Sequence, residues 1–523
     1  RHLQMNKYGF NYIANDIISA RTRQKVLLAQ TENALIKKAE PFGLMAWLNG
    51  APWLEPFYNL SWRQYLKCHA HDTIGGCGID RIEQDATYRL RDSISISDMI
   101  ASESLYALQA KIDTSSLDKN ALVLTVFNPL PFERSAVVSA FVDVAREIEG
   151  KGFAMEDFEG NPVEFDISST NYYGKVFRDH ADLALMSYAD EYELNFFADK
   201  VPACGYKTYL LKRVKDAQKA KPAKGFELEN EYLKAKVNSD GTITVLDKVS
   251  NQAYENLNSF EDGGEMGHSW SHVSPINDLI VSSKGVKAKL SRVSSGSVAN
   301  TIRAEFTLKI PSDTPRSSDY MDWRQSTRLA KDLIPTTFVV EYTLKAGAKN
   351  IEVKVEFENK CRNHRLRAVF NSGVKAENNF AESVFDVAVR RHIRDKKNPY
   401  VEFPELTFPM ARFSGLRDAK RGFAVLGGGL HEYETFADGK YALTITRAYE
   451  NKICTSGDFD LEYKPGDLSQ GIGSHSYKYA LCFGDFGEDY ELLFKQTDEF
   501  SAPLLAAETK SRKGGKLPLS ASF

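Results

Sequence analysis

The first part of the chain follows a helical pattern of apolar positions. The stretch from Arg21 to Leu48 is rich in Ala, Leu, Lys and Gln, which favour helices, and a second predicted helix covers Leu54 to about Ala70. In a third helix apolar residues recur every three or four positions, at Ile82, Ala86, Leu90, Ile94, Leu105, Leu108 and Ile112. Asp80 with Glu83 three residues later is typical of an N-terminal capping pair for this helix.

After about residue 118 the apolar positions change to a period of two, which is the period of β-strands. Residues 122–127 predict a strand that the prolines at 129 and 131 end. The clearest strand runs from Ile351 to Phe357, where apolar residues alternate with Glu352, Lys354 and Glu356. A similar alternation at 340–344 predicts a hairpin with its turn at 345–350. Such strands recur from about residue 222 to 497, with Gly, Asn and Asp turns between them.

Together these patterns predict a multidomain α+β chain. We expect a three-helix bundle at 1–115, a small β-sandwich domain at 116–215 and a large antiparallel β-sandwich domain at 222–500. A charged stretch from about Lys212 to Lys224 links the two β-domains. Residues 501–523 are expected to form a tail or a truncated strand, because Lys510–Lys516 is basic and contains glycine. With 523 residues the chain is too long for a single core.

Composition excludes several classes of function. The net charge of −3 gives no reason to expect a nucleic acid or an anionic membrane surface as a partner, and no apolar run approaches the ~20 residues of a membrane span. The six cysteines are scattered without a Cys-x-x-Cys pair, which argues against a zinc ribbon and a dense disulfide framework. Since no signal peptide stands at the start, a cytoplasmic location is predicted. The sequence leaves assembly into a homo-oligomer open.

The candidate chemistry lies between the second and third predicted helices. The run Cys68-His69-Ala70-His71-Asp72-Thr73-Ile74-Gly75-Gly76-Cys77 places two imidazoles and a carboxylate within four residues, and its paired glycines predict a helix end that faces a cleft. The next histidine is His180, so the run can supply one or two metal ligands and a closed structural zinc site is not expected. The spacing alone does not decide between two alternatives. The histidines belong to a catalytic site that distant residues complete, or they are ordinary polar residues at a helix terminus.

The order of helical bundle, His-Asp motif and β-sandwich resembles the latter part of glycoside hydrolase family 38, the retaining α-mannosidases. The run above matches that family's pattern Asn/His-x-His-Asp-x-Ile-x-Gly. Further similarity to the bacterial mannosylglycerate-hydrolase branch lies in four short segments: Gly205-Tyr206-Lys207-Thr208, Leu228-Glu229-Asn230-Glu231-Tyr232, Asp240-Gly241-Thr242 and Asn363-His364-Arg365-Leu366-Arg367. The resemblance covers nearly the whole chain.

This resemblance implies a role for each residue of the motif. His71 looks like the zinc ligand that comes from outside the family's catalytic barrel, and Asp72 looks like the carboxylate that binds mannose hydroxyls. His69 is expected to orient the loop from a second layer around the site. The implied cofactor is one zinc ion that binds two hydroxyls of the sugar. The implied substrates are mannose-containing small glycans or a mannosylglycerate-type compound.

The resemblance is incomplete in one respect. The family begins with an α/β barrel that carries a His-x-His-Trp-Asp run, an Asp nucleophile and an Asp acid/base, and none of these can be placed in this sequence. The catalytic pair is therefore expected outside this chain, which alone should not hydrolyse mannosides. Two rivals remain: a non-catalytic carbohydrate-binding or scaffold protein, and another metal hydrolase such as an amidohydrolase.

Three further polar clusters are candidates for binding. Within residues 260–272, Trp270 could stack on a sugar ring or belong to a packed surface turn, whereas a second metal site at His268 and His272 lacks a suitably spaced acid. Arg365 could meet a substrate carboxylate in the leaving-group subsite, or be a solvated residue that blocks a sheet edge. The glycine-rich residues 470–475 lack the strand-to-helix context of a phosphate loop and could instead approach the sugar site.

Overall fold

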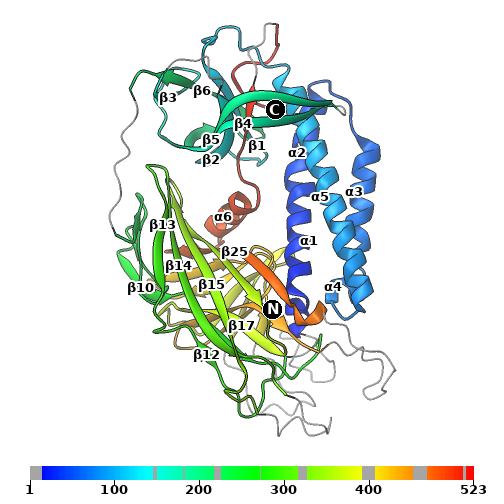
Figure 1. Cartoon of the computed structure of the whole chain (residues 1–523), viewed down its shortest axis with the longest axis vertical. Coiled ribbons are helices and arrows are strands. Elements are labelled where there is room, and N and C mark those ends of the chain that lie inside the picture. Colours follow the sequence, from blue (N-terminus) through cyan, green and yellow to red (C-terminus); the bar gives the residue numbers. More distant parts are fainter. Residues whose placement is uncertain are drawn as a thin grey trace.

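The chain forms a helical bundle beside two β-domains, the small one above the large one in Figure 1. In this computed structural model the described residues are 15–144, 150–180, 183–216, 225–270, 272–315, 327–391, 407–450, 468–509 and 514–523. Most of the predicted link at 212–224 and of the basic stretch at 510–516 lies outside them. Among the described helices none is both long enough and apolar enough to cross a membrane.

The bundle has three long antiparallel helical segments, as the periodicity predicts. The first begins after the 3-10 turn η2 (Asn15–Ser19) and runs without a break through α1 (Thr22–Ala34), the π-helical turn η3 (Leu35–Ala39) and α2 (Glu40–Leu48). The second is α3 (Glu55–Lys67), and the third is α5 (Asp80–Gln109). The short helix α4 (His71–Gly75) lies between α3 and α5. Their shared core includes Leu35, Tyr58, Leu90 and Ile100.

The predicted capping pair at the start of α5 is wrong. Ile79 occupies the N-cap position without a side-chain cap, and Asp80 and Glu83 turn instead toward Arg21. The guanidinium of Arg21 is almost wholly buried, and an Asp80 carboxylate oxygen lies 3.2 Å from its Nη2. Burying a cation without counter-charges costs far more free energy than leaving a helix amide uncapped. The two carboxylates therefore neutralise Arg21 and do not cap the helix.

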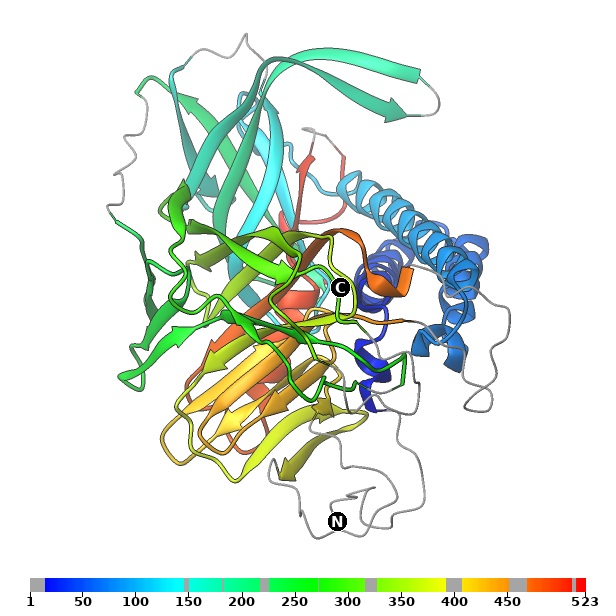
Figure 2. The same ribbon diagram turned by 60° about the horizontal axis from the view of Figure 1, so that its bottom comes forward.

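The small β-domain is a sandwich of two antiparallel sheets. One sheet has the order β26-β1-β6-β27, with β3 paired to β6, and the other has the order β2-β5-β4. Valine, leucine and aromatic side chains from both sheets fill the space between them. Figure 2 shows the hairpin of β4 and β5 extending past the rest of the domain. The strands are β1 (Leu122–Asn128), β2 (Arg134–Val144), β3 (Gly152–Asp157), β4 (Phe165–His180), β5 (Leu183–Val201), β6 (Gly205–Val214), β26 (Leu505–Thr509) and β27 (Ser520–Ser522).

The end of the chain belongs to this small domain. Of the two alternatives for residues 501–523, the flexible tail is wrong for the described part: β26 pairs with β1, and β27 pairs with β6. Phe523 packs against the ring of Tyr206, with ring centroids 5.6 Å apart. These segments complete a sheet whose other strands lie some 300 to 400 residues earlier in the chain, a pairing that no local pattern reports.

The large β-domain contains three antiparallel sheets. Their orders are β10-β9-β8-β7, β12-β11-β17-β24-β23-β20 and β13-β14-β15-β16-β25-β22-β21-β18-β19. The first comprises β7 (Glu227–Glu229), β8 (Leu233–Val237), β9 (Ile243–Asp247) and β10 (Gln252–Leu257). The second comprises β11 (Ser259–Gly264), β12 (Val281–Ser282), β17 (His364–Asn371), β20 (Thr407–Pro409), β23 (Glu432–Thr435) and β24 (Lys440–Ala448). The third comprises β13 (Lys289–Ser295), β14 (Ala299–Pro311), β15 (Leu333–Lys345), β16 (Asn350–Asn359), β18 (Asn378–Ser383), β19 (Asp386–Arg391), β21 (Phe413–Arg417), β22 (Gly422–Leu426) and β25 (Gly473–Phe483).

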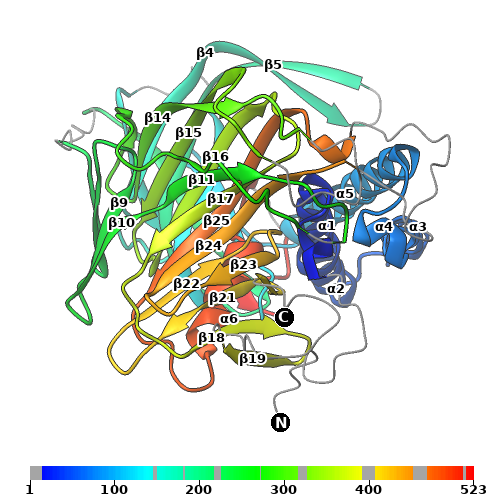
Figure 3. The same ribbon diagram turned by 90° about the horizontal axis from the view of Figure 1, so that it is seen from below.

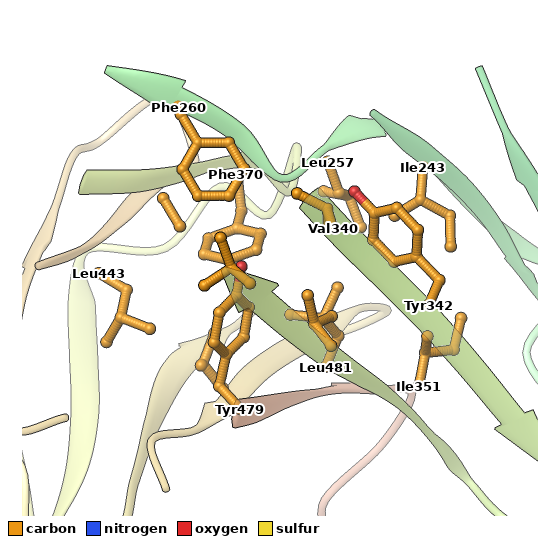
Figure 4. Packing of buried hydrophobic residues seen from close by; sticks show 14 of the residues in the cluster. Ile243, Leu257, Phe260, Val340, Tyr342, Ile351, Phe370, Leu443, Tyr479 and Leu481 are labelled. Carbon is orange, nitrogen blue, oxygen red and sulfur yellow. The ribbon is translucent and has the colours of Figure 1, made fainter. Parts of the chain in front are cut away.

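The core of the large domain lies between these sheets. Figure 4 shows Phe260 and Phe370 from the six-stranded sheet opposite Val340, Tyr342 and Tyr479 from the nine-stranded one. The buried hydroxyls are satisfied by Asn258, which accepts from Tyr479 at 2.5 Å and donates to Tyr342 at 2.9 Å. The strand predicted at 351–357 is the middle of β16, and its side chains alternate between buried and half-buried as the pattern predicts.

The bundle contacts the large domain at one end. There η2 and α1 lie against β20, β23 and β24, and Figure 3 shows α1 next to the sheets with α4 farther out. The guanidinium of Arg447, at the end of β24, donates to the Ser19 hydroxyl at 2.9 Å and to the carbonyl of Asp16 at 2.8 Å. The helix α6 (Glu491–Ser501) is linked to η3, between α1 and α2, by the ion pair of Lys37 and Asp498. These contacts set the end of the bundle that carries α4 beside the β-sheets.

Candidate active site at helix α4

Helix α4 ends at a glycine pair that the segment before α1 approaches closely. Gly75 is the last helical residue, and Gly76 has a φ of 73°, in the left-handed region that favours glycine at a helix end. A Cβ on Gly75 would lie 2.7 Å from Cδ1 of Ile17, and one on Gly76 would lie 3.2 Å from the Cβ of Ala20. The sequence prediction of a helix end at this pair is confirmed.

His71 and Asp72 project into solvent from the first turn of α4. The His71 side chain is 95% exposed and that of Asp72 is 65% exposed, with 3.5 Å between Nε2 and Oδ1. The imidazole therefore does not pack inward against aliphatic side chains. The carboxylate accepts a hydrogen bond at 3.2 Å from the Cys77 thiol, which is buried under the end of the helix. Both groups of the motif can be reached from outside.

Trp270 reaches the same place from the large domain. Burial raises the pKa of the Cys77 thiol, and the hydrogen bond from the Trp270 side chain acts in the opposite direction. Cys77 thus contacts both Asp72 and Trp270, so the structure brings these two predicted site residues together. The backbone N–H of Trp270 donates to Nδ1 of His268 at 3.2 Å. A tryptophan and an exposed carboxylate that share one partner offer groups that suit a sugar, whose faces are apolar and whose rim is polar.

His69 lies against the end of α3, just before α4 begins. Its Nδ1 donates to the carbonyl of Tyr65 at 3.0 Å. Its ring packs edge-on against the Tyr65 ring, with ring centroids 4.3 Å apart. The imidazole thus closes the last turn of α3, just before the chain enters α4. The predicted orienting role of His69 stays a prediction.

The histidines near Trp270 are engaged with protein groups. Nδ1 of His272 lies 2.6 Å from Oε2 of Glu265, and Nε2 lies 3.0 Å from the Ser274 hydroxyl. Burial raises the pKa of Glu265, but His272 and Arg447, whose Nη1 lies 3.6 Å away, lower it to about 2. Glu265 is therefore ionised and anchors the Trp270 loop. Sequence reasoning missed this role, because an isolated glutamate in a loop carries no signal of a distant arginine.

Arg365 lies inside the large domain. It belongs to β17, which is between β11 and β24, so the alternative of a solvated residue at a sheet edge is wrong. Its Nη2 donates to Glu432 at 2.7 Å and to Thr444 at 3.1 Å. Although burial lowers the pKa of Arg365, the charges of Glu432 and Asp16 raise it overall. The structure does not bring this guanidinium to the surface beside α4, and its role in a subsite stays a prediction.

The glycine-rich loop approaches the bundle close to α4. It follows the 3-10 turn η5 (Leu468–Gln470), where the backbone N–H of Leu468 donates to Asp80 at 3.1 Å. The carbonyl of Ile472 accepts from Arg23 at 2.9 Å. Gln470 itself is buried and exchanges two hydrogen bonds with Asn363, so the loop is also fixed to the start of β17.

The donors at α4 fit a shared metal site and not a closed one. In the part of the chain that the structure describes, no three His, Cys, Asp or Glu side chains gather closely enough to hold a metal ion. An exposed imidazole next to an exposed carboxylate has the donor chemistry of one side of a zinc site. Further ligands would have to come from residues outside this set.

Comparison with known proteins finds similarity to glycosidases. Residues 228–452 match the family model described as "Glycosyl hydrolases family 38 C-terminal domain". A curated relative from Halalkalibacterium halodurans, named "Putative mannosylglycerate hydrolase", is 24% identical over 530 residues that cover 95% of this chain and 56% of the relative. The chain thus spans little more than half of that relative.

Two crystal structures from Enterococcus faecalis share the fold. An alpha-mannosidase from strain V583 has a TM-score of 0.86 at 21% identity, covering 97% of this chain and 59% of that one. A protein in the glycosyl hydrolase family 38 has a TM-score of 0.85 at 21% identity, covering 97% and 62% of the two chains. The predicted α+β multidomain fold and the predicted family resemblance are confirmed.

Proposed function

We propose that the chain carries one side of the zinc- and sugar-binding site of a retaining α-mannosidase. The premise is the match of residues 228–452 to the model of the glycosyl hydrolase family 38 C-terminal domain. The observation that supports this most directly is the exposed pair His71 and Asp72 on α4. Their type, adjacency and exposure are those that binding a sugar-bound metal ion requires.

Each residue has a defined task in this proposal. His71 coordinates zinc through a neutral ring nitrogen, and Asp72 accepts hydrogen bonds from sugar hydroxyls. The thiol of Cys77, 3.2 Å from Oδ1 of Asp72, holds that carboxylate in one orientation. Trp270 provides an aromatic surface on the side of the large domain. Zinc, when bound, supplies a positive charge that holds two hydroxyls of a distorted sugar ring.

The bond-breaking groups come from elsewhere in this proposal. A retaining glycosidase needs two carboxyl groups about 5 Å apart, one as nucleophile and one as acid/base. We assign neither to Asp72, whose task is hydroxyl binding, and place both outside this chain. The substrate is an α-mannoside, either a small glycan or a mannosylglycerate-type compound, and the alcohol that leaves is bound outside α4.

A reducing compartment agrees with the cysteines. The described cysteines Cys68, Cys77, Cys204, Cys361 and Cys482 are all free thiols. The hydrogen bond from Cys77 to Asp72 needs a thiol and is lost on oxidation. This supports the proposal of a cytoplasmic protein.

The metal part of the proposal is tested by titrating the purified chain with zinc. The His71 ring signal is followed by NMR in the wild type, in Asp72→Asn and in Asp72→Ala. Zinc should shift and broaden the His71 signal with weak, saturable affinity, because one imidazole and one carboxylate make an incomplete site. Both Asp72 variants should weaken the effect. His431 of the large domain is half-buried, and its Nδ1 is hydrogen-bonded to the carbonyl of Ala411. It is the matched histidine whose signal should not respond.

Two outcomes contradict the proposal. If zinc shifts the signals of His71 and His431 equally, the pair at α4 is not a metal site, and the carbohydrate-binding or scaffold alternative is favoured. If the chain alone hydrolyses 4-nitrophenyl α-mannoside at rates typical of glycosidases, the assignment of nucleophile and acid/base to residues outside it is wrong.

A further inference from the structure

The short helix α4 depends on other elements for its hydrogen bonds. A helix of five residues is far below the length at which isolated helices are stable in water. Its last turn leaves carbonyl oxygens that no amide of the helix can reach, and side chains or water must satisfy such groups. In this structure side chains from the start of α1 and from the residue after β24 bind them.

Lys25 of α1 binds the last turn of α4. Its Nζ donates to the carbonyl oxygens of Ile74 and Ala20, each at 2.8 Å. The side chain is buried, and no described carboxylate forms an ion pair with it. Burial lowers the pKa of Lys25 to about 7, and the charges of Arg447 and Arg21 act in the same direction. Since burying an uncompensated ammonium is costly, these two carbonyls are its main support in the fold.

The carbonyl of Gly76, two residues after Ile74, receives two hydrogen bonds. They come from the Tyr449 hydroxyl and from Nε of Arg21, both at 3.0 Å. Arg21 also donates to the carbonyl of Gly78 at 2.8 Å and pairs with Asp80, so it ties the whole link between α4 and α5. The hydroxyl of Tyr449 reaches the same carbonyl from the large domain. Positive charge at a helix C-terminus is favoured by the helix dipole.

These contacts bear on the segment that carries His71 and Asp72. The backbone N–H of Cys77 donates to the carbonyl of Asp72 at 3.3 Å, and the Cys77 thiol donates to the Asp72 carboxylate at 3.2 Å. The segment from His71 to Cys77 is thus one hydrogen-bonded unit. A shift of Ile74 or Gly76 within it moves the imidazole and the carboxylate.

We propose that Lys25 and Tyr449 are positioning residues, which hold the carbonyls of Ile74 and Gly76 and thereby fix the direction of His71 and Asp72. We call the hydrogen bonds from Lys25 and Tyr449 to these two carbonyls the clamp. Its importance for activity rests on the proposed function, but its existence does not. The two residues come from different domains, Lys25 from α1 of the bundle and Tyr449 from the position after β24, so α4 is fixed to both. Arg21 is less informative about positioning, because it also neutralises Asp80 and Glu83.

The clamp is tested in the full chain with Lys25→Met and Tyr449→Phe, which remove the donors and keep most of the volume. Lys25→Arg restores a cation, and Lys38→Met is the matched control, since Lys38 forms an exposed ion pair with Asp98. Two rates are measured by mass spectrometry: amide hydrogen exchange of residues 71–78, and alkylation of Cys77 by iodoacetamide. Cys68, a buried thiol of the same bundle, reports general loosening.

Both single variants should accelerate exchange at 71–78 and alkylation of Cys77 about tenfold, as expected for loss of a buried hydrogen bond to or from a polar group. The alkylation rate of Cys68 and the exchange rates of the α5 amides should stay unchanged. In Lys25→Arg, exchange at 71–78 and alkylation of Cys77 should be closer to the wild-type rates than in Lys25→Met. In NMR spectra the His71 ring signal should shift in Lys25→Met and Tyr449→Phe but not in Lys38→Met.

The proposal is overturned if both variants leave residues 71–78 and Cys77 unchanged. It is also overturned if Cys68 and α5 loosen to the same extent, because the effect is then one of general stability. None of these measurements uses zinc or a sugar, so the clamp can stand while the zinc titration of His71 fails, and the reverse can also be observed.

Discussion

Asp262 holds two buried basic groups of the large domain. Its carboxylate pairs with Arg328 and lies 2.6 Å from Nδ1 of His364, and all three side chains are almost wholly buried. Asp262→Ala leaves a guanidinium without its counter-charge, so we expect the free energy of unfolding to fall by about 3–5 kcal/mol. Urea unfolding followed by circular dichroism measures this.

The matched control for Asp262 is Glu305, an exposed acidic residue of β14 in the same domain. Glu305→Ala should change the free energy of unfolding by at most about 0.5 kcal/mol. Equal losses in the two variants would show that the buried network contributes no more than a surface charge.

Lys25 should make stability depend on pH between about 7 and 10.4. Burial and the charges of Arg447 and Arg21 lower its pKa to about 7, whereas Cys77 and Glu432 act in the other direction; in the unfolded chain the value is near 10.4. Between these values the unfolded state binds a proton that the folded state does not, so stability rises with pH.

We therefore compare Lys25→Met with the wild type by urea unfolding at pH 6, 7, 8 and 9. The wild type should gain free energy of unfolding relative to the variant as pH rises above 7. Between pH 6 and about 7 the difference in free energy of unfolding should be constant. Lys38→Met serves again as the control and should show no such slope. A constant difference for Lys25→Met across all four pH values would mean that Lys25 is protonated in the fold throughout.

Helix α4 ends at Gly76 for two separable reasons, its backbone conformation and the space available. Gly76→Ala places a Cβ at φ 73° and 3.2 Å from the Cβ of Ala20. Gly50, in the same bundle, has a φ of 81°, but its Cβ would meet only Nζ of Lys111, at 3.4 Å. Gly50→Ala should lower the free energy of unfolding by about 1–2 kcal/mol through strain alone, and Gly76→Ala by about 2–4 kcal/mol through strain and crowding.

Thermal unfolding of the two alanine variants measures this difference, with Gly76→Ala expected to melt at the lower temperature. A second reading is alkylation of Cys77, which should rise in Gly76→Ala alone. Equal melting temperatures would show that Ala20 and its neighbours yield without cost, and that α4 is less tightly seated than its contacts indicate.

Helices and strands can be predicted from the sequence where neighbouring residues determine them. The alternation at 351–357 predicts β16 because one face of that strand is buried and the other is not. The capping pair at Asp80 and Glu83 fails for the opposite reason. Both acids satisfy the motif locally, yet they bind Arg21, about 60 residues earlier in the chain. The three long helices are likewise predictable from apolar spacing alone.

The candidate site is predictable only in part. His71 and Asp72 stand in a motif whose residues are adjacent, and the glycine pair after them predicts the helix end. By contrast, the contact of Trp270 with Cys77 joins two domains, and the partners of Arg365 lie on neighbouring strands that the sequence does not align. The residue type therefore predicts which side chain, such as that of Arg365, could bind a ligand. Whether that side chain is exposed depends on which strand lies at the centre of a sheet.

At the scale of the whole molecule, the end of the chain supports the domain that begins near residue 122. The strand β26 pairs five residues with β1, and β27 pairs three with β6. Leu504, just before β26, is buried in the core between the two sheets of the small domain. A chain cut after residue 502 therefore exposes the edge of β1 and part of this core, and exposed edges promote aggregation and proteolysis.

We expect the chain 1–502 to be cleaved within residues 122–214 by trypsin at concentrations that leave the full chain intact, and to be less soluble. The chain 1–513 is the matched control. It keeps β26 and loses β27 together with the segment before it, in which Leu517 forms a bridge with Ile112. Its small domain should therefore show an intermediate sensitivity to trypsin. Cleavage sites are identified by mass spectrometry, with the large domain as an internal reference that both cuts leave in place. If 1–502 resists trypsin as well as the full chain does, β1 and β6 hold their sheet without the C-terminal strands, and the small domain is independent of the end of the chain.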